Sequence, residues 1–579
     1  MKIRIGLLAA LLFGLVLPAT AEPALPPAPV SPPGLAPERM ASYARSHMVA
    51  AANPLAAEAG RAMLRAGGSA VDAAIAVQMV LTLVEPQSSG IGGGAFLLHW
   101  QAAARELRTY DGRETAPAAA TPDQFLGPDG RLLRFMDAVV GGLSVGVPGA
   151  VRMLEMAHRA HGRLPWTDLF QPAIRLAEQG FPISPRLASA LADDRALRGE
   201  PAAAAYFYQP DGTPKPAGTM LANPALAETL RTIAAEGADA LHAGPIAQDI
   251  VAAVAGAARP GRMTEADLAG YRPREREPVC VPYRVWRVCG MGAPSSGGIA
   301  IAQVLGMVER HDIASGGAAS PAAWHLLLEA SRLAFADRDL YVADPDRVPP
   351  PAGLLDRGYL AGRGRLIDAG RSGGKVPAGE PPGRRAALAP DRSLEVPSTS
   401  HMAIVDRDGN AVSMTTTIEG PFGAKLMVRG FLLNNELTDF SFVPEAGGRP
   451  VANRVEGGKR PRSSMSPTMV FDRDGRLLAV LGSPGGARII GYTLKTLVAM
   501  LDWGLDPQRA VSLPNLLNRN GPTELEDLPG TATLAEALRA RGHEVQPMTA
   551  PSGLQAIRVL ADGLVGGADP RREGVAVGD

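Results

Sequence analysis

Thr399 stands at the start of a predicted β-hairpin and is the first candidate for chemistry in this 579-residue chain. The alternating run 401–405, the turn Asp408-Gly409 and the returning run 411–418 form a pattern typical of two antiparallel strands. A hydroxyl nucleophile needs a base within hydrogen-bond reach, and the α-amino group freed by a cut before Thr399 can be that base. An ordinary threonine near a strand end fits the same pattern, so the hairpin alone leaves both interpretations open.

Charged residues and glycines elsewhere supply the other groups that such a nucleophile would need. Arg113 lies in a polar loop, and a guanidinium there can hold a carboxylate. Glu436 and Asp439 are three residues apart and can face one ligand, for example an ammonium group. Gly485-Gly486 directly precede a helix predicted over 487–501, and successive glycine N–H groups at a helix start suit an oxyanion. A surface arginine and a solvated acidic turn are the simpler alternatives for the charged residues.

The elements around these residues predict a mixed α and β protein. A short strand over 47–52 leads into Asn53-Pro54, which predicts a capped helix start, and residues 69–72 predict a second helix that is apolar on all sides and therefore buried. The glycine-rich loop 85–94 lacks the Gly-Lys-Ser/Thr ending of a phosphate loop. The remaining patterns predict helices over about 149–270, 299–310 and 321–339. They predict strands over 279–292 and 430–433 and a hairpin over 468–481.

Residues 371–398 differ in composition from the rest of the chain. Arginine, glycine and proline dominate, and large apolar residues are few. This composition predicts a flexible segment. Because the segment ends beside Thr399, it has the properties that a processing site requires.

The composition is that of a soluble globular protein, with 46% hydrophobic and 20% charged residues. Basic and acidic residues both number 58, so the charge balance does not point to nucleic acid or an anionic membrane. At the N-terminus, Lys2 and Arg4 precede the apolar run 5–17 and the small residues of Ala19-Thr20-Ala21. This pattern predicts a signal peptide over 1–21, since the run is short for a membrane anchor, and hence a periplasmic or secreted protein. Residues 22–45 are expected to form a mobile leader, with order beginning at His47.

The two cysteines, Cys280 and Cys289, lie in two predicted strands around a turn. A disulfide in an oxidising compartment and two buried thiols both fit this position. Two cysteines do not make a metal site, and the nine histidines show no strong ligand spacing, so no metal is predicted.

Taken together, the order and spacing of the motifs resemble the γ-glutamyltranspeptidase (γ-glutamyltransferase) family of the N-terminal-nucleophile hydrolase superfamily. The resemblance extends over nearly the whole mature chain. Its motifs are Asn53-Pro54-Leu55-Ala56, the loop 85–94, residues 113–117, 294–298, Thr399-Ser400-His401, 433–436, 463–467, 482–486 and 568–571.

The resemblance implies an α+β fold, a four-layer αββα sandwich, built from two chains of one precursor cut between Ser398 and Thr399. The chains would be a large subunit, 22–398, and a small subunit, 399–579, that form a heterodimer. The roles that the resemblance implies are listed by function: Thr399 as nucleophile, Thr417 as its orienting partner, Gly485 and Gly486 as the oxyanion hole, Arg113, Ser463 and Ser464 for the donor carboxylate, and Glu436 and Asp439 for its ammonium group.

The implied reaction is a double displacement without metal or organic cofactor. Thr399 would attack the γ-glutamyl amide of glutathione or a related donor, and the acyl group would pass to water or to an amino acid or peptide. Two alternatives remain open: a cephalosporin-acylase-like amidase of the same fold, and an inactive secreted binding homologue.

The chain departs from the family pattern at two places. Glu419 stands where many members have an asparagine that touches the donor carboxylate, and the segment between Ser441 and Lys459, which carries a lid in several members, looks short and has no tyrosine. Glu419 would repel the carboxylate or bind the ammonium group beside Glu436 and Asp439. Repulsion is slightly favoured on the sequence alone.

Overall fold

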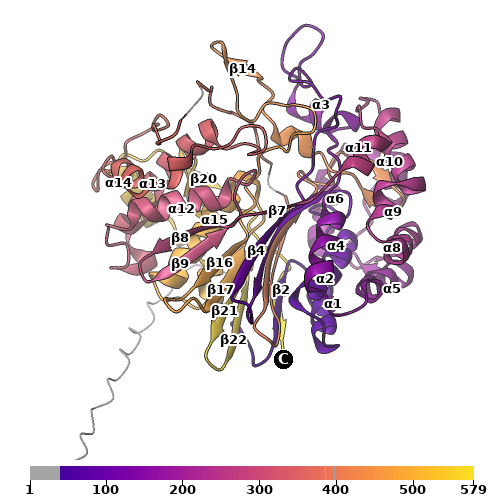
Figure 1. The fold of residues 1–579 in the computed structure, drawn as a ribbon, viewed down its shortest axis with the longest axis horizontal. Coiled ribbons are helices and arrows are strands. Elements are labelled where there is room, and N and C mark those ends of the chain that lie inside the picture. The colour runs from indigo at the N-terminus through magenta and orange to yellow at the C-terminus, as the bar shows by residue number, and fades with distance from the viewer. Residues whose placement is uncertain (1–38, 385–386, 397) are drawn as a thin grey trace, which may run out of the picture.

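The computed structural model describes residues 39–384, 387–396 and 398–579. The predicted signal peptide, 1–21, lies outside the described residues. Two seven-stranded sheets stack face to face, and helices cover both outer faces (Figure 1). This arrangement confirms the predicted four-layer sandwich.

The first sheet is antiparallel and carries the predicted nucleophile hairpin at its centre. Its strands in spatial order are β23 (Val575–Gly578), β2 (Met48–Ala51), β10 (Ser400–Val405), β11 (Ala411–Thr417), β3 (Gly94–Gln101), β4 (Glu106–Asp111) and β7 (Arg274–Arg276). The second sheet is also antiparallel. Its order is β1 (Ser42–Ala44), β22 (Gly563–Ala568), β21 (Gln555–Leu560), β17 (Leu477–Gly482), β16 (Thr468–Phe471), β9 (Trp286–Gly290) and β8 (Val279–Tyr283).

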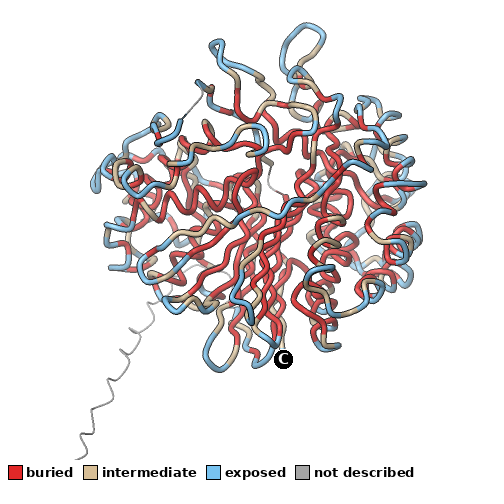
Figure 2. The backbone as a smooth tube through the Cα atoms, viewed as in Figure 1, coloured by how far each residue is buried: buried red, intermediate tan, exposed pale blue. Residues whose placement is uncertain are grey.

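Each sheet has its own outer layer of helices. The first sheet is covered by helices from the N-terminal half of the chain: α1 (Pro54–Arg65), α2 (Ala70–Val84), α4 (Ala150–His161), α5 (Gln171–Gln179), α8 (Pro224–Glu236) and α10 (Gly244–Gly256). The second is covered by α12 (Gly297–Val308), α13 (Pro321–Tyr341), α15 (Ile489–Leu501) and α16 (Pro507–Ser512). Figure 2 shows that buried residues run through both sheets and the inner faces of these helices.

Three apolar cores hold the layers together. The core between the sheets contains Met48, Phe96, Met469, Val480 and Ile557. Two further cores lie between each sheet and its own helices. Because side chains of a strand alternate between its two faces, these buried strands supply the central core from one face and an outer core from the other.

The local signals at the start of the chain are confirmed. Asn53 caps α1 by accepting the Leu55 N–H at 2.9 Å, and Ser69 with Asp72 forms a capping box at the start of α2. Every residue of α2 is buried, as its apolar sequence predicts. Order begins earlier than predicted, however, because β1 pairs with β22 within the segment expected to be a mobile leader.

Two predicted elements differ in detail. The helix expected over 487–501 begins as a 3₁₀ turn, Gly486–Arg488, and becomes α15 at Ile489. The strand expected over 430–433 is only β13 (Phe431–Leu432), and Glu436–Asp439 forms a 3₁₀ turn after it.

Cys280 and Cys289 form a disulfide. They are directly opposite in the antiparallel pair β8 and β9, which brings their side chains together. The structure therefore settles the choice that the sequence left open. In the described part of the chain, no helix is both long enough and apolar enough to cross a membrane.

Candidate active site

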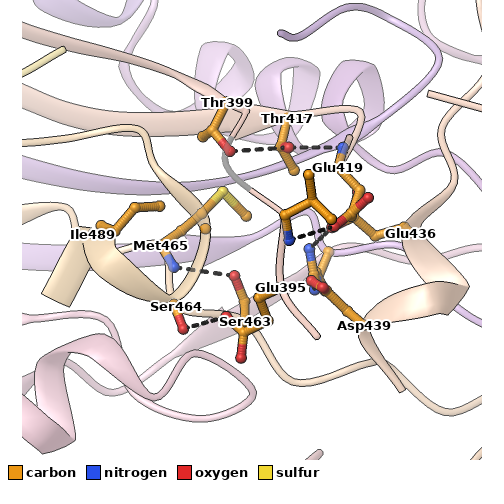
Figure 3. A pocket seen from close by; sticks show the side chains of 13 residues that line it. Glu395, Thr399, Thr417, Glu419, Glu436, Asp439, Ser463, Ser464, Met465 and Ile489 are labelled. Atoms are coloured by element: carbon orange, nitrogen blue, oxygen red, sulfur yellow. Dashed lines mark hydrogen bonds and ion pairs between the residues drawn. The ribbon is translucent and has the colours of Figure 1, made fainter. Parts of the chain in front are cut away.

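Thr399 and Thr417 meet because the hairpin has the predicted register. Ser400 of β10 is opposite Thr416 of β11, so the residue before the first strand lies beside the last residue of the second. The Thr399 hydroxyl donates to Thr417 Oγ1 at 3.2 Å, and the Glu419 N–H donates to the same oxygen at 2.8 Å (Figure 3). Thr417 thus fixes the position of the Thr399 side chain.

The backbone around the proposed cleavage site has an unusual conformation. Thr399 has φ 87°, in the left-handed region that β-branched residues avoid. The carbonyl oxygen of Ser398 accepts the Gly485 N–H at 3.0 Å. A backbone donor on this carbonyl polarises it toward attack by the hydroxyl of the next residue, Thr399, while the Ser398 hydroxyl donates to the Gln87 carbonyl at 2.8 Å.

Gly485 and Gly486 both need to be glycine. They have φ values of 137° and 60°, and an added Cβ at Gly485 would lie 2.7 Å from Tyr492. At Gly486 an added Cβ would lie 2.9 Å from the carbonyl oxygens of Glu395 and Val396. The predicted oxyanion turn therefore packs directly against the segment that precedes Thr399.

Arg113 lies between the two acids that were predicted to bind an ammonium group. Its Nη1 pairs with Glu436, and its Nη2 pairs with Asp439 Oδ2 at 2.5 Å. Its remaining donors reach the carbonyl oxygens of Pro461 and Arg462 at 3.1 and 2.8 Å. The structure brings the predicted residues together, but it pairs the arginine with acids of this chain.

Three carboxylates, those of Glu114, Glu436 and Asp439, lie within 4 Å of the Arg113 guanidinium. Glu114 lies 3.8 Å from Arg113, and neither of its oxygens has a hydrogen-bond partner among the described residues. Burial, and after it the neighbouring negative charges, holds the pKa of Glu114, Glu419 and Asp439 well above the ordinary range. Burial also raises the pKa of Glu436. The excess of carboxylates makes this end of the pocket suited to a cation.

Glu419 belongs to this acidic group. Its Oε1 accepts the Val396 N–H at 3.3 Å, and its Oε2 accepts from the side-chain amide of Asn435. The largest charge effects on its pKa come from Asp439 and Glu436. It also has φ 75°, a strained conformation for a residue other than glycine. These contacts favour the hypothesis of an ammonium ligand over that of repulsion.

Ser463 and Ser464 form the opposite wall of the pocket. The loop before α12 holds Ser463 in place, since Ser296 donates its N–H and hydroxyl to the Ser463 carbonyl at 2.7 and 2.8 Å. Ser464 donates its hydroxyl to Glu395 at 2.5 Å and accepts from Arg338 at 2.7 Å. The sequence analysis missed Glu395 and Arg338, although Glu395 lies only four residues before Thr399.

The pocket itself is small in the uncut chain. Its volume is about 20 Å³, and its lining includes Glu395 and Val396 from the segment predicted to be flexible. No described residue of 371–396 lies in a helix or strand. The segment nevertheless enters the site, where Glu395 contacts Ser464 and Val396 contacts Glu419 (Figure 3).

The described residues also hold one buried cluster of a type that can bind metal: His325, Glu329 and His543. The two imidazoles are hydrogen-bonded to each other at 2.7 Å. Their outer nitrogens contact the Asp368 carbonyl at 2.7 Å and the Thr523 hydroxyl at 3.0 Å. All four ring nitrogens thus have partners, and the geometry is that of a hydrogen-bonded pair.

The four-layer αββα sandwich is the fold of the N-terminal-nucleophile hydrolases. The model of the gamma-glutamyltranspeptidase family matches residues 56–579. A glutathione hydrolase proenzyme of Bacillus subtilis (strain 168) is 38% identical over 544 residues, which cover 92% of this chain and 91% of that protein. The chain belongs to the gamma-glutamyltranspeptidase family, and it is a γ-glutamyl hydrolase or transferase.

Acylases are also among its relatives. An acylase ACY 1 proenzyme of a Pseudomonas species (strain SE83) is 37% identical over 92% of this chain and 93% of that protein. The solved structure of a cephalosporin acylase from Bacillus halodurans is similar, with a TM-score of 0.81, 28% identity and coverage of 97% and 99%. The family is thus clear, while its members differ in the acyl group that they cleave.

Proposed function

We propose that this chain cuts itself between Ser398 and Thr399 and then uses Thr399 to cleave γ-glutamyl amides, including glutathione. The observation that carries the proposal is the hydrogen bond from the Gly485 N–H to the Ser398 carbonyl. The mature subunits would be 22–398 and 399–579. The signal-like residues 1–21 support export to the periplasm or the medium.

Self-cleavage uses groups already in place. The Thr399 hydroxyl attacks the Ser398 carbonyl carbon, and the Gly485 N–H stabilises the negative charge that develops on the oxygen. The carbon–nitrogen bond then breaks, the hydroxyl proton moves to the Thr399 nitrogen, and an ester joins Ser398 to Thr399 Oγ1. Water hydrolyses this ester and leaves a free Thr399 amine. Cleavage also relieves the positive φ of Thr399, a strain of roughly 1–3 kcal/mol.

Turnover repeats the same steps with a donor. The free amine of Thr399 takes the proton from its own hydroxyl, which attacks the γ-glutamyl carbonyl. Gly485 and Gly486 stabilise the oxyanion, and the amine product leaves. Water then releases glutamate, or an amino acid or peptide takes the acyl group.

We expect two groups of side chains in the pocket, one acidic and one containing the serines, to recognise the donor. Glu419, Glu436 and Asp439 surround the position for an ammonium group, and Ser463, Ser464 and Arg113 are the candidates for its carboxylate. An acyl group without an ammonium would add no positive charge to these buried acids, two of which share the single guanidinium of Arg113, and this disfavours a glutaryl donor. A cephalosporin-acylase-like activity remains the second candidate because acylases are close relatives.

The proposal is tested by processing and by a donor panel. The protein should run as two bands on a denaturing gel, the smaller chain should begin at Thr399, and Thr399→Ala should remain one band without activity. Glutathione and a glutaryl amide should then be compared, with and without a dipeptide acceptor. A start other than Thr399 contradicts the nucleophile, and preference for the glutaryl amide favours the second candidate.

A further inference from the structure

Glu395 connects the pre-cleavage segment to the pocket by hydrogen bonds with Ser464 and Arg338. Its side chain is only 4% exposed, although the segment around it has no regular structure. One carboxylate oxygen accepts the Ser464 hydroxyl at 2.5 Å. The other accepts from Arg338 Nη2 and lies 3.5 Å from Arg462 Nη2. A carboxylate of this chain therefore occupies the serine wall of the substrate pocket.

Arg338 is fixed so that one of its donors points at this carboxylate. It comes from α13, and its side chain is 4% exposed. Its Nε donates to Ser296 Oγ at 2.9 Å, and its Nη1 donates to Asp339 at 2.7 Å. Its Nη2 is shared between Ser464, at 2.7 Å, and Glu395. When Glu395 leaves, Arg338 keeps Ser296, Asp339 and Ser464 as acceptors and loses the carboxylate inside the pocket.

The charges agree with this geometry. Burial raises the pKa of the Glu395 carboxyl, but the attraction of Arg338 and Arg462 outweighs it and brings the pKa to about 2. The carboxylate is thus ionised at neutral pH. Arg113, by contrast, already donates four hydrogen bonds within the chain, to Glu436, Asp439 and two carbonyl oxygens.

The same side of the active site must hold Glu395 during self-cleavage and the donor during turnover. In self-cleavage, the acyl group attacked by Thr399 is the chain that ends at Ser398, and it includes Glu395. In turnover, the acyl group is the donor's glutamyl part, which also carries a carboxylate. Both acyl groups place their carbonyl at the Gly485 N–H, so both must extend into the same pocket.

We propose that Arg338 and Ser464 form a carboxylate seat that Glu395 occupies before cleavage and the donor's carboxylate occupies afterwards. The inference rests on the proposed function and adds Arg338 as a binding residue. It also gives Glu395 a role: until the segment leaves, it supplies a charged acceptor for Arg338 Nη2, while Asp339 pairs with Nη1 throughout. A charged hydrogen bond to a buried guanidinium is favourable, which gives the segment a reason to enter the site.

The seat can be tested without any catalysis, in the uncut Thr399→Ala protein. Adding Glu395→Ala removes the internal carboxylate, and sodium acetate should then raise the melting temperature more than sodium chloride of equal ionic strength. Acetate should not do so in Thr399→Ala alone or with Glu380→Ala, a matched control because Glu380 is an exposed acid of the same segment. Equal effects of acetate on the Glu395→Ala and Glu380→Ala proteins would overturn the proposal.

Kinetics of the processed enzyme then test whether the donor uses the seat. Arg338→Lys should raise KM and lower kcat/KM roughly tenfold for a γ-glutamyl anilide, because a charged hydrogen bond is lost. It should leave a 4-aminobutyryl anilide unchanged, since that donor keeps the amine and lacks the carboxylate. Arg363→Lys is the control, a buried arginine that pairs with Asp337 at 3.2 Å.

The outcomes separate this inference from the proposed function. Equal losses on both anilides, or no loss on either, would show that the donor carboxylate does not bind Arg338. If the wild-type enzyme cleaves neither anilide nor glutathione, the proposed function fails. The acetate experiment still decides whether the seat binds a carboxylate.

Discussion

At the scale of single residues, the uncut chain already holds the parts of its own first reaction. Thr399 is strained, its hydroxyl is oriented by Thr417, and the carbonyl before it accepts from Gly485. None of these features depends on a bound substrate. In the proposed mechanism the Gly485 N–H serves both processing and catalysis, so a single substitution should impair both.

Gly485→Ala should slow both self-cleavage and turnover. The added Cβ would lie 2.7 Å from Tyr492 and would tilt the N–H away from the carbonyl. Loss of one such donor costs about 3 kcal/mol, roughly a hundredfold in rate. Time courses on denaturing gels and anilide assays measure the two steps. Gly504→Ala is the control, since Gly504 also has a positive φ but an added Cβ there meets open space. Normal rates for Gly485→Ala would place the oxyanion donor elsewhere.

Glu419→Asn should lower kcat/KM for a γ-glutamyl donor. The sequence slightly favoured repulsion and hence a gain, but Glu419 lies with Glu436 and Asp439 and shares their negative potential. Removing one acid weakens the attraction for the donor ammonium, and we expect a loss of roughly tenfold, about 1.4 kcal/mol. A donor without the α-amine should not show the loss. A rise in kcat/KM for the glutamyl donor would restore the repulsion hypothesis.

Glu114→Gln should reduce the loss of stability with rising pH. The folded state raises the pKa of the Glu114 carboxyl, chiefly through burial. Its contribution to the free energy of unfolding is therefore fully present below the ordinary pKa of about 4.5 and is lost as pH rises through the raised pKa. Urea unfolding of the Thr399→Ala protein between acid and alkaline pH measures this slope. An unchanged slope in Thr399→Ala/Glu114→Gln would show that Glu114 does not titrate in this range.

At the scale of elements, the hairpin β10–β11 could be predicted because two independent signals agree. The alternating residues and the Asp408-Gly409 turn fix both strand type and register, and register places Thr399 beside Thr417. The caps of α1 and α2 were predictable for a similar reason, since a cap depends on residues a few positions apart. Interactions between residues that are close in the sequence can therefore be predicted from it.

Contacts over long sequence distances could not be predicted in the same way. The sequence assigned Arg113 to a carboxylate and Glu436 and Asp439 to an ammonium group, but nothing in it showed that these residues pair in the uncut chain. Arg338 and Glu395 are 57 positions apart, and one lies in a segment without periodicity. The three-residue strand β1 likewise forms only because β22 supplies its partner. Tertiary packing determines whether such pairs and strands form.

At the scale of the whole molecule, the proposed cut at Thr399 would divide the chain but not the fold. In the first sheet, β10 of the small subunit pairs with β2 of the large subunit, and β11 pairs with β3. In the second sheet, β16 pairs with β9, and β1 pairs with β22. Both chains thus contribute to both sheets and to the core between them.

The two chains of the processed enzyme should therefore remain associated until the protein unfolds. Separating the subunits would break ladder hydrogen bonds in both sheets and expose the central core, so dissociation and unfolding should coincide. Size-exclusion chromatography should show both chains eluting together, at the volume of the uncut protein, at every urea concentration below the unfolding transition. Uncut Thr399→Ala is the control for the elution volume. Release of a folded small subunit under native conditions would show that the interleaved strands do not hold the two chains together.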